Sequence, residues 1–280
     1  MTGPHVLVDY RVKARNTSTN SENKIHDDTV ARRYGFGGGL VPGVTVYAYV
    51  THPLAKAFGA AWLERGTASI RFVRPIFEGE EVLVSGRIGE RGPQGIAVTL
   101  TASTEARGEC AVATATLPDA TPAPPAPMDA GAYGAAPLPA ERPEPTRAHL
   151  ASLAALGTPV ERYDEALAAD YVAKVSDTLP LYRGQGGLVH PAFLLHQANQ
   201  ALSRNVLLGP WIHTGSIVRH LGAGRIGETL STRGRVRALA EKKGREMVEL
   251  DLLLVGEGSR PLAHVLHSAI YRLPAPSPAS

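Results

Sequence analysis

The sequence predicts an α+β protein in which one structural unit occurs twice. Three observations lead to this prediction. Two segments share a series of glycine-centred matches, and each of them passes from an apolar helical stretch into strands of alternating polarity. A proline-rich segment separates the two. We therefore expect two long central helices, each wrapped by an antiparallel β-sheet, within a single chain.

The composition indicates a globular chain and excludes several classes of protein. Of the 280 residues, 44% are hydrophobic and 20% are charged. The formal net charge of +3 is too small to indicate a nucleic-acid partner. A single cysteine, Cys110, excludes a disulfide within the chain and a cysteine-based zinc site. No apolar run approaches the roughly 20 residues that cross a bilayer, and the start of the sequence lacks signal-peptide features. We expect a soluble, cytoplasmic protein with no membrane partner.

The proline-rich segment marks the boundary between the two halves. The sequence predicts a first unit over residues 1–117, a linker over 118–148, a second unit over 149–273 and a disordered tail over 274–280. Gly-Gly-Leu-Val begins at both Gly38 and Gly186, and the pair at Gly79 matches the pair at Gly227. Two copies are too few for a solenoid, so the pattern suggests a duplicated domain that forms a pseudo-dimer inside one chain.

Hydrophobic periodicity then places the elements of each half. In the first half, helical spacing relates Val46, Val50, Leu54, Ala57 and Phe58. We expect Pro53 to kink or restart this helix. In the second half, the same spacing relates Leu194, Leu195, Ala198, Leu202 and Val206. Beyond the first helix the pattern changes to strand alternation, with one face made by Ile96, Val98, Leu100 and Ala102.

The run from Asn20 to Phe36 carries the residues best suited to chemistry. Asp28 is a suitable N-cap for a short helix, and His26 stands just before that cap, held in place by Ile25. The glycine-rich loop over 37–43 follows, and glycine allows the backbone to approach a ligand closely. Amides at the start of the next helix could polarise a carbonyl group or bind an anion.

This run resembles the hydratase motif of the MaoC-like family, which includes (R)-specific enoyl-CoA hydratases and related acyl dehydratases. The residues that fall on the pattern are Asn23, Ile25, His26, Asp28, Ala31, Gly35 and Gly43. Arg74-Pro75 and Gly79-Glu80 resemble a strand turn of the same family. The resemblance covers residues 5–117 and continues more weakly over 184–273. It implies a hot dog fold, and two units in one chain would form a double hot dog.

The resemblance also implies a reaction: syn addition or removal of water across the C2–C3 bond of an acyl thioester. On this basis His26 is the predicted acid/base group, with Asn23 and Ser21 positioning the water. The Gly43 amide would polarise the thioester carbonyl. The predicted substrate-binding residues are Gly43, Val41, Tyr47 and Asp177. The partner would be a small acyl thioester of coenzyme A or of an acyl carrier protein, with no cofactor and no metal.

Two positions depart from the family pattern. Ser21 stands five residues before His26, where the family has its catalytic aspartate, and Pro42 replaces a histidine before the helix-start glycine. In the second half, Asp177 and Tyr182 repeat this spacing with tyrosine in the histidine position, and no room remains for the short helix that follows His26. We interpret the second half as a degenerate copy that shapes the acyl tunnel and leaves space for a longer acyl group.

Five further histidines are interpreted as structural. His190 precedes Pro191 at the start of the second long helix and is expected to cap it. The other four lie in strand-like alternation, are expected to be bonded or exposed, and show no metal-ligand spacing; they are His213, His220, His264 and His267.

Three functions stay open from the sequence. The first is a hydratase or dehydratase acting on an acyl thioester. The second is thioester hydrolysis, for which neither long helix offers a well-placed carboxylate. The third is a non-catalytic acyl-binding protein that has lost the aspartate. Phosphates of the thioester carrier could be met by Arg32, Arg33, Arg71 and Arg74, which also suit a solvated face. The sequence is compatible with a homodimer.

Overall fold

The computed structural model describes residues 7–119 and 133–275. Within these ranges the first half contributes the strands β1 (Tyr10–Lys13), β2 (Thr67–Phe72), β3 (Glu81–Gly92), β4 (Gly95–Thr104) and β5 (Gly108–Leu117). The second half contributes β6 (Val160–Arg162), β7 (Ile212–His220), β8 (Thr229–Lys242), β9 (Arg245–Val255) and β10 (Pro261–Arg272). Every pairing between these strands is antiparallel.

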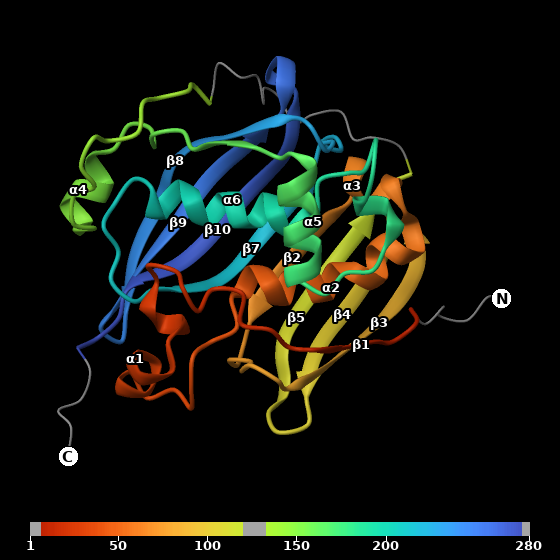
Figure 1. Ribbon diagram of the computed structural model, residues 1–280, viewed down its shortest axis with the longest axis horizontal. Helices are drawn as coiled ribbons and strands as arrows, with labels where there is room; N and C mark the ends of the chain where they lie inside the picture. The colour runs from red at the N-terminus through yellow and green to blue at the C-terminus, as the bar shows by residue number, and fades with distance from the viewer. Residues whose placement is uncertain (1–6, 120–132, 276–280) are drawn as a thin grey trace.

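The strands form one ten-stranded sheet whose order shows the duplication directly. The order is β1-β3-β4-β5-β2-β7-β10-β9-β8-β6. Read outwards from the central β2–β7 pair, the strands of the second half follow the same order as those of the first. Backbone bonds between Thr67–Arg71 and Gly215–Arg219 join the halves into a continuous sheet (Figure 1). The prediction of an α+β unit built twice in one chain is confirmed.

Two long helices lie against one face of this sheet (Figure 1). They are α2 (Gly43–Phe58) and α6 (Pro191–Ser203), and they contact each other. Every residue of α2 from Val44 to Ala55 is buried, because the sheet covers one side of the helix and α6 and the connecting segments cover the others. A helix apolar on all sides is the kind that a sheet can enclose.

The helix does not restart at Pro53, because α2 runs without interruption from Gly43 to Phe58. Proline removes one hydrogen bond from a helix and disfavours its interior by about 3 kcal/mol. Burial of the surrounding turns compensates for this loss, and the Thr51 hydroxyl donates to the carbonyls of Tyr47 and Ala48 one turn earlier. The chain turns only at Gly59, whose φ is +60°.

Shorter elements connect the strands and the two long helices. They are α1 (Asp28–Arg33), α3 (Ala60–Arg65), α4 (Arg147–Ser152), α5 (Glu165–Lys174) and the 3₁₀ turns Lys24–His26, Pro180–Tyr182 and Glu257–Ser259. In β4 the predicted alternation holds, with Val98, Leu100 and Ala102 buried. None of the helices in the described ranges is both long and apolar enough to cross a membrane.

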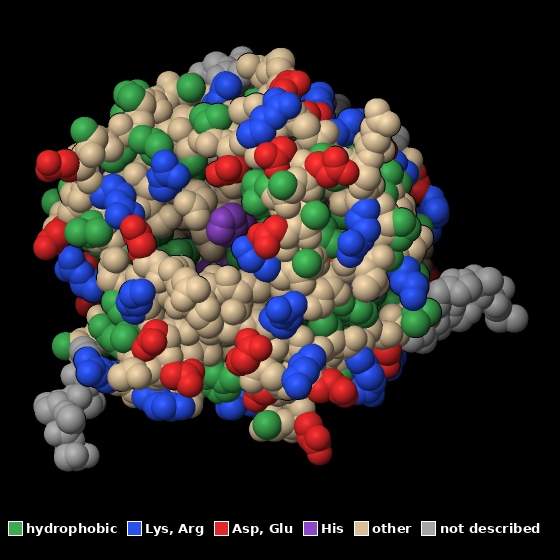
Figure 2. Space-filling model, in the orientation of Figure 1, with side chains coloured by type: hydrophobic (Ala, Val, Ile, Leu, Met, Phe, Trp, Pro, Cys, Tyr) green, Lys and Arg blue, Asp and Glu red, His purple; other side chains and the backbone are tan. Residues whose placement is uncertain are grey.

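The predicted linker and tail lie partly outside the described residues, namely over 120–132 and 276–280. After the gap, the Tyr133 hydroxyl donates to the carboxylate of Asp251 in β9. Arg142 bonds both Glu22 of the first half and the Ser203 carbonyl of α6. On the face shown in Figure 2, acidic and basic side chains are interspersed and do not form a continuous surface of one sign.

Candidate active site

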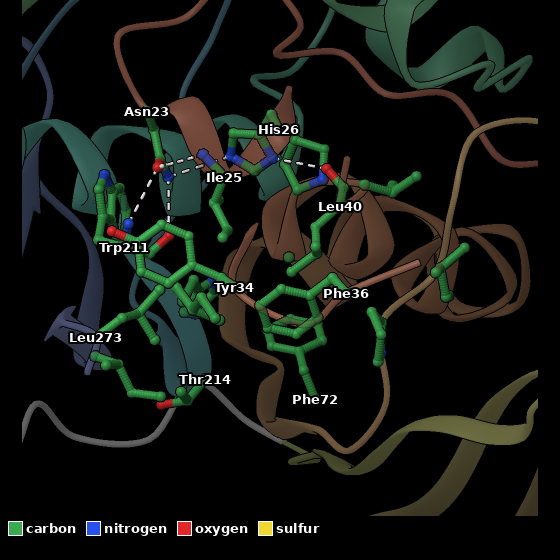
Figure 3. A pocket seen from close by; sticks show the side chains of 18 of the residues that line it. Asn23, Ile25, His26, Tyr34, Phe36, Leu40, Phe72, Trp211, Thr214 and Leu273 are labelled. Atoms are coloured by element: carbon green, nitrogen blue, oxygen red, sulfur yellow. Dashed lines mark hydrogen bonds between the residues drawn. The ribbon is translucent and has the colours of Figure 1, made fainter. Parts of the chain in front are cut away.

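A cavity of about 990 Å³ lies where the two halves meet. The first half contributes the turn at His26, the glycine-rich loop, the amino end of α2 and the end of β2. The second half contributes residues of α6, the start of β7 and the end of β10. In Figure 3, Asn23 and His26 face the side chains of Tyr34, Phe36 and Phe72 across this space. The cavity therefore combines a polar corner with an apolar wall.

His26 is held rigidly in the polar corner. It ends the 3₁₀ turn Lys24–His26, which Ile25 anchors in the core with only 1% of its surface exposed. The ring Nδ1 lies 2.7 Å from the carbonyl oxygen of Leu40, so Nδ1–H is the donor and Nε2 carries the lone pair. Burial lowers the pKa of His26, and the Leu40 bond opposes this only in part. The imidazole is therefore neutral near pH 7 and able to accept a proton.

Asn23 fastens this turn to the second half (Figure 3). Its Oδ1 accepts from the Trp211 amide at 3.1 Å, and its Nδ2 donates to the Trp211 carbonyl at 3.0 Å. The same Nδ2 carries a second hydrogen and lies 3.3 Å from His26 Nε2, so it donates a long hydrogen bond to that nitrogen. Asn23 thus fixes the ring of His26, and a ligand that bonds to Nε2 replaces or shares this long bond.

The short helix α1 has a different cap from the predicted one. Asp27, not Asp28, is its N-cap and accepts from the Val30 amide at 2.9 Å. Asp28 instead accepts from the Gly39 amide at 2.7 Å and so pulls the glycine-rich loop against α1. At Gly39 a Cβ atom would lie 2.2 Å from the His26 carbonyl oxygen, so only glycine allows the loop to pass this close to His26.

The amino end of α2 is open to the cavity. Pro42 precedes the helix and provides no side-chain cap. The first amides bonded within the helix are those of Thr45 and Val46, both to the Pro42 carbonyl. The N–H groups of Gly43 and Val44 therefore have no acceptor inside the helix, and Gly43 lines the cavity. Such free donors at a helix start favour a carbonyl oxygen or an anion.

The structure brings together four of the seven predicted site residues. His26, Asn23, Gly43 and Val41 all line the cavity. Ser21 does not line it; its hydroxyl donates to the Asn23 carbonyl at 3.3 Å on the outer side of the turn. Tyr47 is fully buried inside α2, away from the cavity lining.

Asp177, the seventh predicted residue, lies in a separate buried cluster. Its carboxylate accepts from the Leu179 amide at 2.9 Å and lies 3.3 Å from His190 Nε2 and 3.1 Å from His52 Nδ1. No residue from 176 to 190 lines the cavity. The space expected from the shortened second-half connection is occupied by packed side chains, including Tyr182, which is 1% exposed.

Several cavity residues were not expected from the sequence. Asn199, Trp211, His213, Thr214 and Arg245 all come from the second half. Only the repeated tryptophan hinted at any of them. Among the described residues, four exposed arginines line the cavity, namely Arg32, Arg33, Arg74 and Arg245, whereas no aspartate or glutamate does. The described residues also include no set of three or more His, Cys, Asp or Glu side chains that could hold a metal ion.

Comparison with known proteins identifies the fold. No model of a known family matches the sequence, and no curated protein matches it. Solved structures do. A candidate MaoC-domain dehydratase from Chloroflexus aurantiacus J-10-fl matches with a TM-score of 0.65 and 12% identity over 98% of this chain and 97% of that one. The Mycobacterium tuberculosis protein Rv0216, described as having a double hotdog fold, matches with a TM-score of 0.64 and 15% identity over 96% of both chains.

A third solved structure extends the range of similar proteins. A candidate oleoyl thioesterase from Lactobacillus plantarum matches with a TM-score of 0.53 and 12% identity over 97% of this chain and 98% of that one. Identities this low show the fold alone. The chain is a double hot dog protein, as predicted, with both units in one polypeptide.

Proposed function

We propose that this protein adds water to, or removes it from, the C2–C3 bond of an acyl thioester. The observation that carries the proposal is that His26 Nε2, which bears a lone pair, and the free amides at the start of α2 line the same cavity. A thioester carbonyl bound at the helix start would place its C2 and C3 within the polar corner. The structural similarity to a candidate MaoC-domain dehydratase supports this assignment.

One imidazole can carry out both proton transfers. In the direction of hydration, His26 Nε2 removes a proton from water while the water oxygen bonds to C3. The electron pair of the C2–C3 double bond moves towards the carbonyl, and the Gly43 amide stabilises the enolate oxygen. The protonated His26 then returns the proton to C2 on the same face. One water is added, and dehydration is the reverse.

A single base suits the composition of this cavity. The family pattern pairs histidine with an aspartate, but Ser21 occupies that position and lies outside the cavity lining. Glu22 is also turned away, because its carboxylate is bonded to Arg142 at 2.7 Å. With no carboxylate among the described lining residues, His26 is the proton acceptor that the site offers.

The arginines favour a substrate with a phosphorylated carrier. Arg33 and Arg245 are exposed, line the cavity, and come from different halves of the chain. Guanidinium groups bind phosphate oxygens in bidentate geometry. We therefore propose a thioester of coenzyme A or of a carrier-bound phosphopantetheine. Replacing Arg33 and Arg245 by alanine should raise KM more than it lowers kcat, with an effect that weakens as salt is added.

The test offers trans-2-enoyl-CoA substrates of increasing chain length and follows the absorbance of the conjugated thioester. The wild-type protein should consume at least one of them, and His26→Ala should be slower by about 100-fold or more. Tyr182→Phe, a change in the equivalent turn of the second half, is the matched control and should retain the rate. Equal rates for wild type and His26→Ala would exclude this mechanism.

Hydrolysis of the thioester is the second candidate, because structures described as thioesterases share the fold. A free-thiol assay on saturated acyl-CoA distinguishes the two reactions. Release of thiol without any change in an enoyl substrate would favour hydrolysis, with His26 activating the water. Binding of acyl-CoA with neither reaction would indicate the non-catalytic alternative.

A further inference from the structure

His213 is a buried histidine whose Nδ1 faces the amino end of α2 without a hydrogen-bond partner among the described residues. It lies near the start of β7, is only 7% exposed, and lines the cavity. Its Nδ1 has no hydrogen-bond partner among the described residues. A Cβ built on Gly43 would be 2.8 Å from this Nδ1, so the atom lies directly against the first residue of α2. Leaving a buried polar atom unpaired is costly, and a ligand at this place would relieve the cost.

The other nitrogen of His213 is already bonded. Nε2 lies 2.9 Å from the Ser216 hydroxyl, and the same hydroxyl lies 3.0 Å from Nδ1 of His267, whose ring stacks on His213. A hydroxyl has one proton, so Ser216 donates to one ring and accepts from the other. When Ser216 donates to His213 Nε2, the single proton of the neutral imidazole resides on Nδ1, facing the helix start.

The ring is neutral in this environment. Burial lowers the pKa of His213 well below its usual value, the nearby His267 lowers it further, and a bond to the Gly215 backbone opposes this only in part. The positive end of the α2 dipole also disfavours a cationic imidazole there. A neutral imidazole N–H is a good hydrogen-bond donor to a developing oxyanion and does not need to release its proton.

We propose that His213 is a catalytic residue whose Nδ1–H donates a hydrogen bond to the substrate carbonyl oxygen alongside the Gly43 amide. This inference rests on the proposed function and extends it. The carbonyl oxygen would lie between a donor from the first half and a donor from the second, so neither hot dog unit alone would contain the complete site. Phe72, whose ring centre is 4.9 Å from that of His213, would hold the imidazole from the side.

Three substitutions separate this role from a purely structural one. His213→Asn keeps an amide group at the position of Nδ1, His213→Gln keeps one near the position of Nε2, and His213→Leu keeps neither. Loss of one oxyanion donor lowers kcat by about 100-fold to 1,000-fold. We expect that loss for the leucine and glutamine variants, with KM changed by less than about 3-fold, and recovery of at least about 10-fold in kcat for the asparagine variant relative to leucine.

The alternative is that His213 serves only to bond Ser216 in the core. In that case glutamine, which can still reach Ser216, would be the best replacement, and kcat would follow thermal stability across the three variants. That pattern, or a leucine variant with a kcat within 3-fold of wild type, would overturn the proposal.

A second measurement uses the wild-type protein and does not depend on turnover or on how well the variants fold. ¹⁵N-labelled protein is titrated with butyryl-CoA, which has a thioester carbonyl but no double bond to hydrate. The Nδ1 resonance of His213 should shift on binding, with the proton on Nδ1.

The two measurements together separate the two hypotheses. Turnover of enoyl-CoA with no Nδ1 shift would keep the proposed function and overturn the role of His213. A shift without turnover would support the contact and overturn the hydratase. Absence of both binding and turnover would overturn both.

Discussion

Each half of the molecule forms a 3₁₀ turn before its long helix. Only in the first half does this turn face the cavity, and we call that half open and the other closed. In the first half, the turn ends at His26 and the chain makes α1 and the glycine-rich loop before Leu40 pairs with Phe77. In the second half, the equivalent turn ends at Tyr182 and the chain proceeds directly to Leu188, which makes the equivalent bridge. The inserted segment of the first half forms one wall of the cavity.

The amino ends of the two long helices also differ, one being uncapped and the other capped. Pro42 leaves the amino end of α2 uncapped, whereas α6 is capped by His190, whose Nδ1 accepts from the Ala192 amide at 3.1 Å. Proline at position 191 removes a further donor from α6. The cap expected at His190 is therefore present. Of these two helix starts in the described part of the chain, only that of α2, which faces the cavity, keeps free donors.

Asp177 and His190 of the second half bond each other, and His52 of α2 contacts the same carboxylate. Burial opposes ionisation of Asp177, but hydrogen bonds from His190 and His52 outweigh it and hold the pKa of this carboxyl well below its usual value. The first half has Ser21 and Pro42 where the second has Asp177 and His190. The comparison shows that one backbone frame can either bury its polar groups in mutual bonds or leave them for a ligand.

The largest effect on activity is expected when His26, which ends the turn of the first half, is replaced by tyrosine, the residue that ends the turn of the second half. His26→Tyr makes the open turn resemble the closed one and removes the base, so we expect kcat to fall by roughly 100-fold to 10,000-fold.

In the wild type, kcat/KM should decline as pH falls through the pKa of His26, which lies below its ordinary value, and stay level above it, because the neutral ring is the active form. Steady-state kinetics from pH 5 to pH 8 check both expectations.

The control for this exchange is Tyr182→Phe. The Tyr182 hydroxyl is buried and has no hydrogen-bond partner among the described residues, so its removal should change unfolding free energy by less than about 1 kcal/mol. Activity should be unchanged. A large loss of kcat in Tyr182→Phe would contradict the distinction between an open and a closed half.

Filling the helix start should have the next largest effect. In Gly43→Ala the new Cβ would lie 2.8 Å from His213 Nδ1 and 2.9 Å from Phe72 Cε2, so at least one ring must move. We expect kcat/KM to fall by about 100-fold because the carbonyl loses its position against the amide. Pro191→Ala at the start of α6 is the matched variant and should leave kinetics unaltered. Similar losses in both would indicate a general effect on folding.

Local signals in the sequence predicted the fold well. The helical spacing around Val50, the alternation through Leu100 and the glycine matches at Gly79 and Gly227 each depend on neighbouring residues, and each is found as expected. The helix does not restart at Pro53, because burial of the whole helix outweighs the local preference of proline.

The cavity lining was predicted only where a single segment of the chain contributes it. His26, Asn23 and Gly43 lie within a short stretch of chain, so their spacing carried the signal. Trp211 and His213 reach the cavity through the register of β2 against β7, which no local pattern specifies. The choice between Asp27 and Asp28 as cap was likewise decided by a tertiary contact, the bond from the Gly39 amide.

The buried cluster of Asp177, His190 and His52 should contribute to the free energy of unfolding. Asp177→Asn leaves two histidines facing an uncharged amide, and we expect a loss of about 2–4 kcal/mol in unfolding free energy at pH 7. The pKa of Asp177 is depressed in the fold, so its contribution is present above the unfolded pKa and is lost as pH falls below it. The difference between wild type and variant should narrow by about 1 kcal/mol between pH 5 and pH 3. Urea unfolding of both proteins at each pH measures this difference in unfolding free energy.

Ser21→Ala is the matched change in the open half. Ser21 is partly exposed, and its hydroxyl makes one hydrogen bond among the described residues, to the Asn23 carbonyl at 3.3 Å. Its replacement should cost less than about 0.5 kcal/mol, with no dependence on pH. Equal losses for Asp177→Asn and Ser21→Ala would show that the two turns are not used differently.

The last comparison is between the final residues of β2 and β7, which are Phe72 and His220. His220 is fully buried, its ring packs edge-on against Trp62, and neither of its ring nitrogens has a partner among the described residues. Burial lowers its pKa to about 4, so the unfolded chain gains a proton below about pH 6.5 that the folded chain resists.

His220 therefore lowers stability as pH falls from 6.5 towards 4, and His220→Phe should remove that dependence. We expect the variant to be more stable than wild type by about 1 kcal/mol at pH 7, because an unpaired buried polar group is removed. The advantage should grow by about 2 kcal/mol at pH 5. Thermal unfolding across this range measures both values. A variant that is less stable than wild type at pH 5 would mean that the His220 ring has a polar partner in solution, and that the second half holds a polar site of its own.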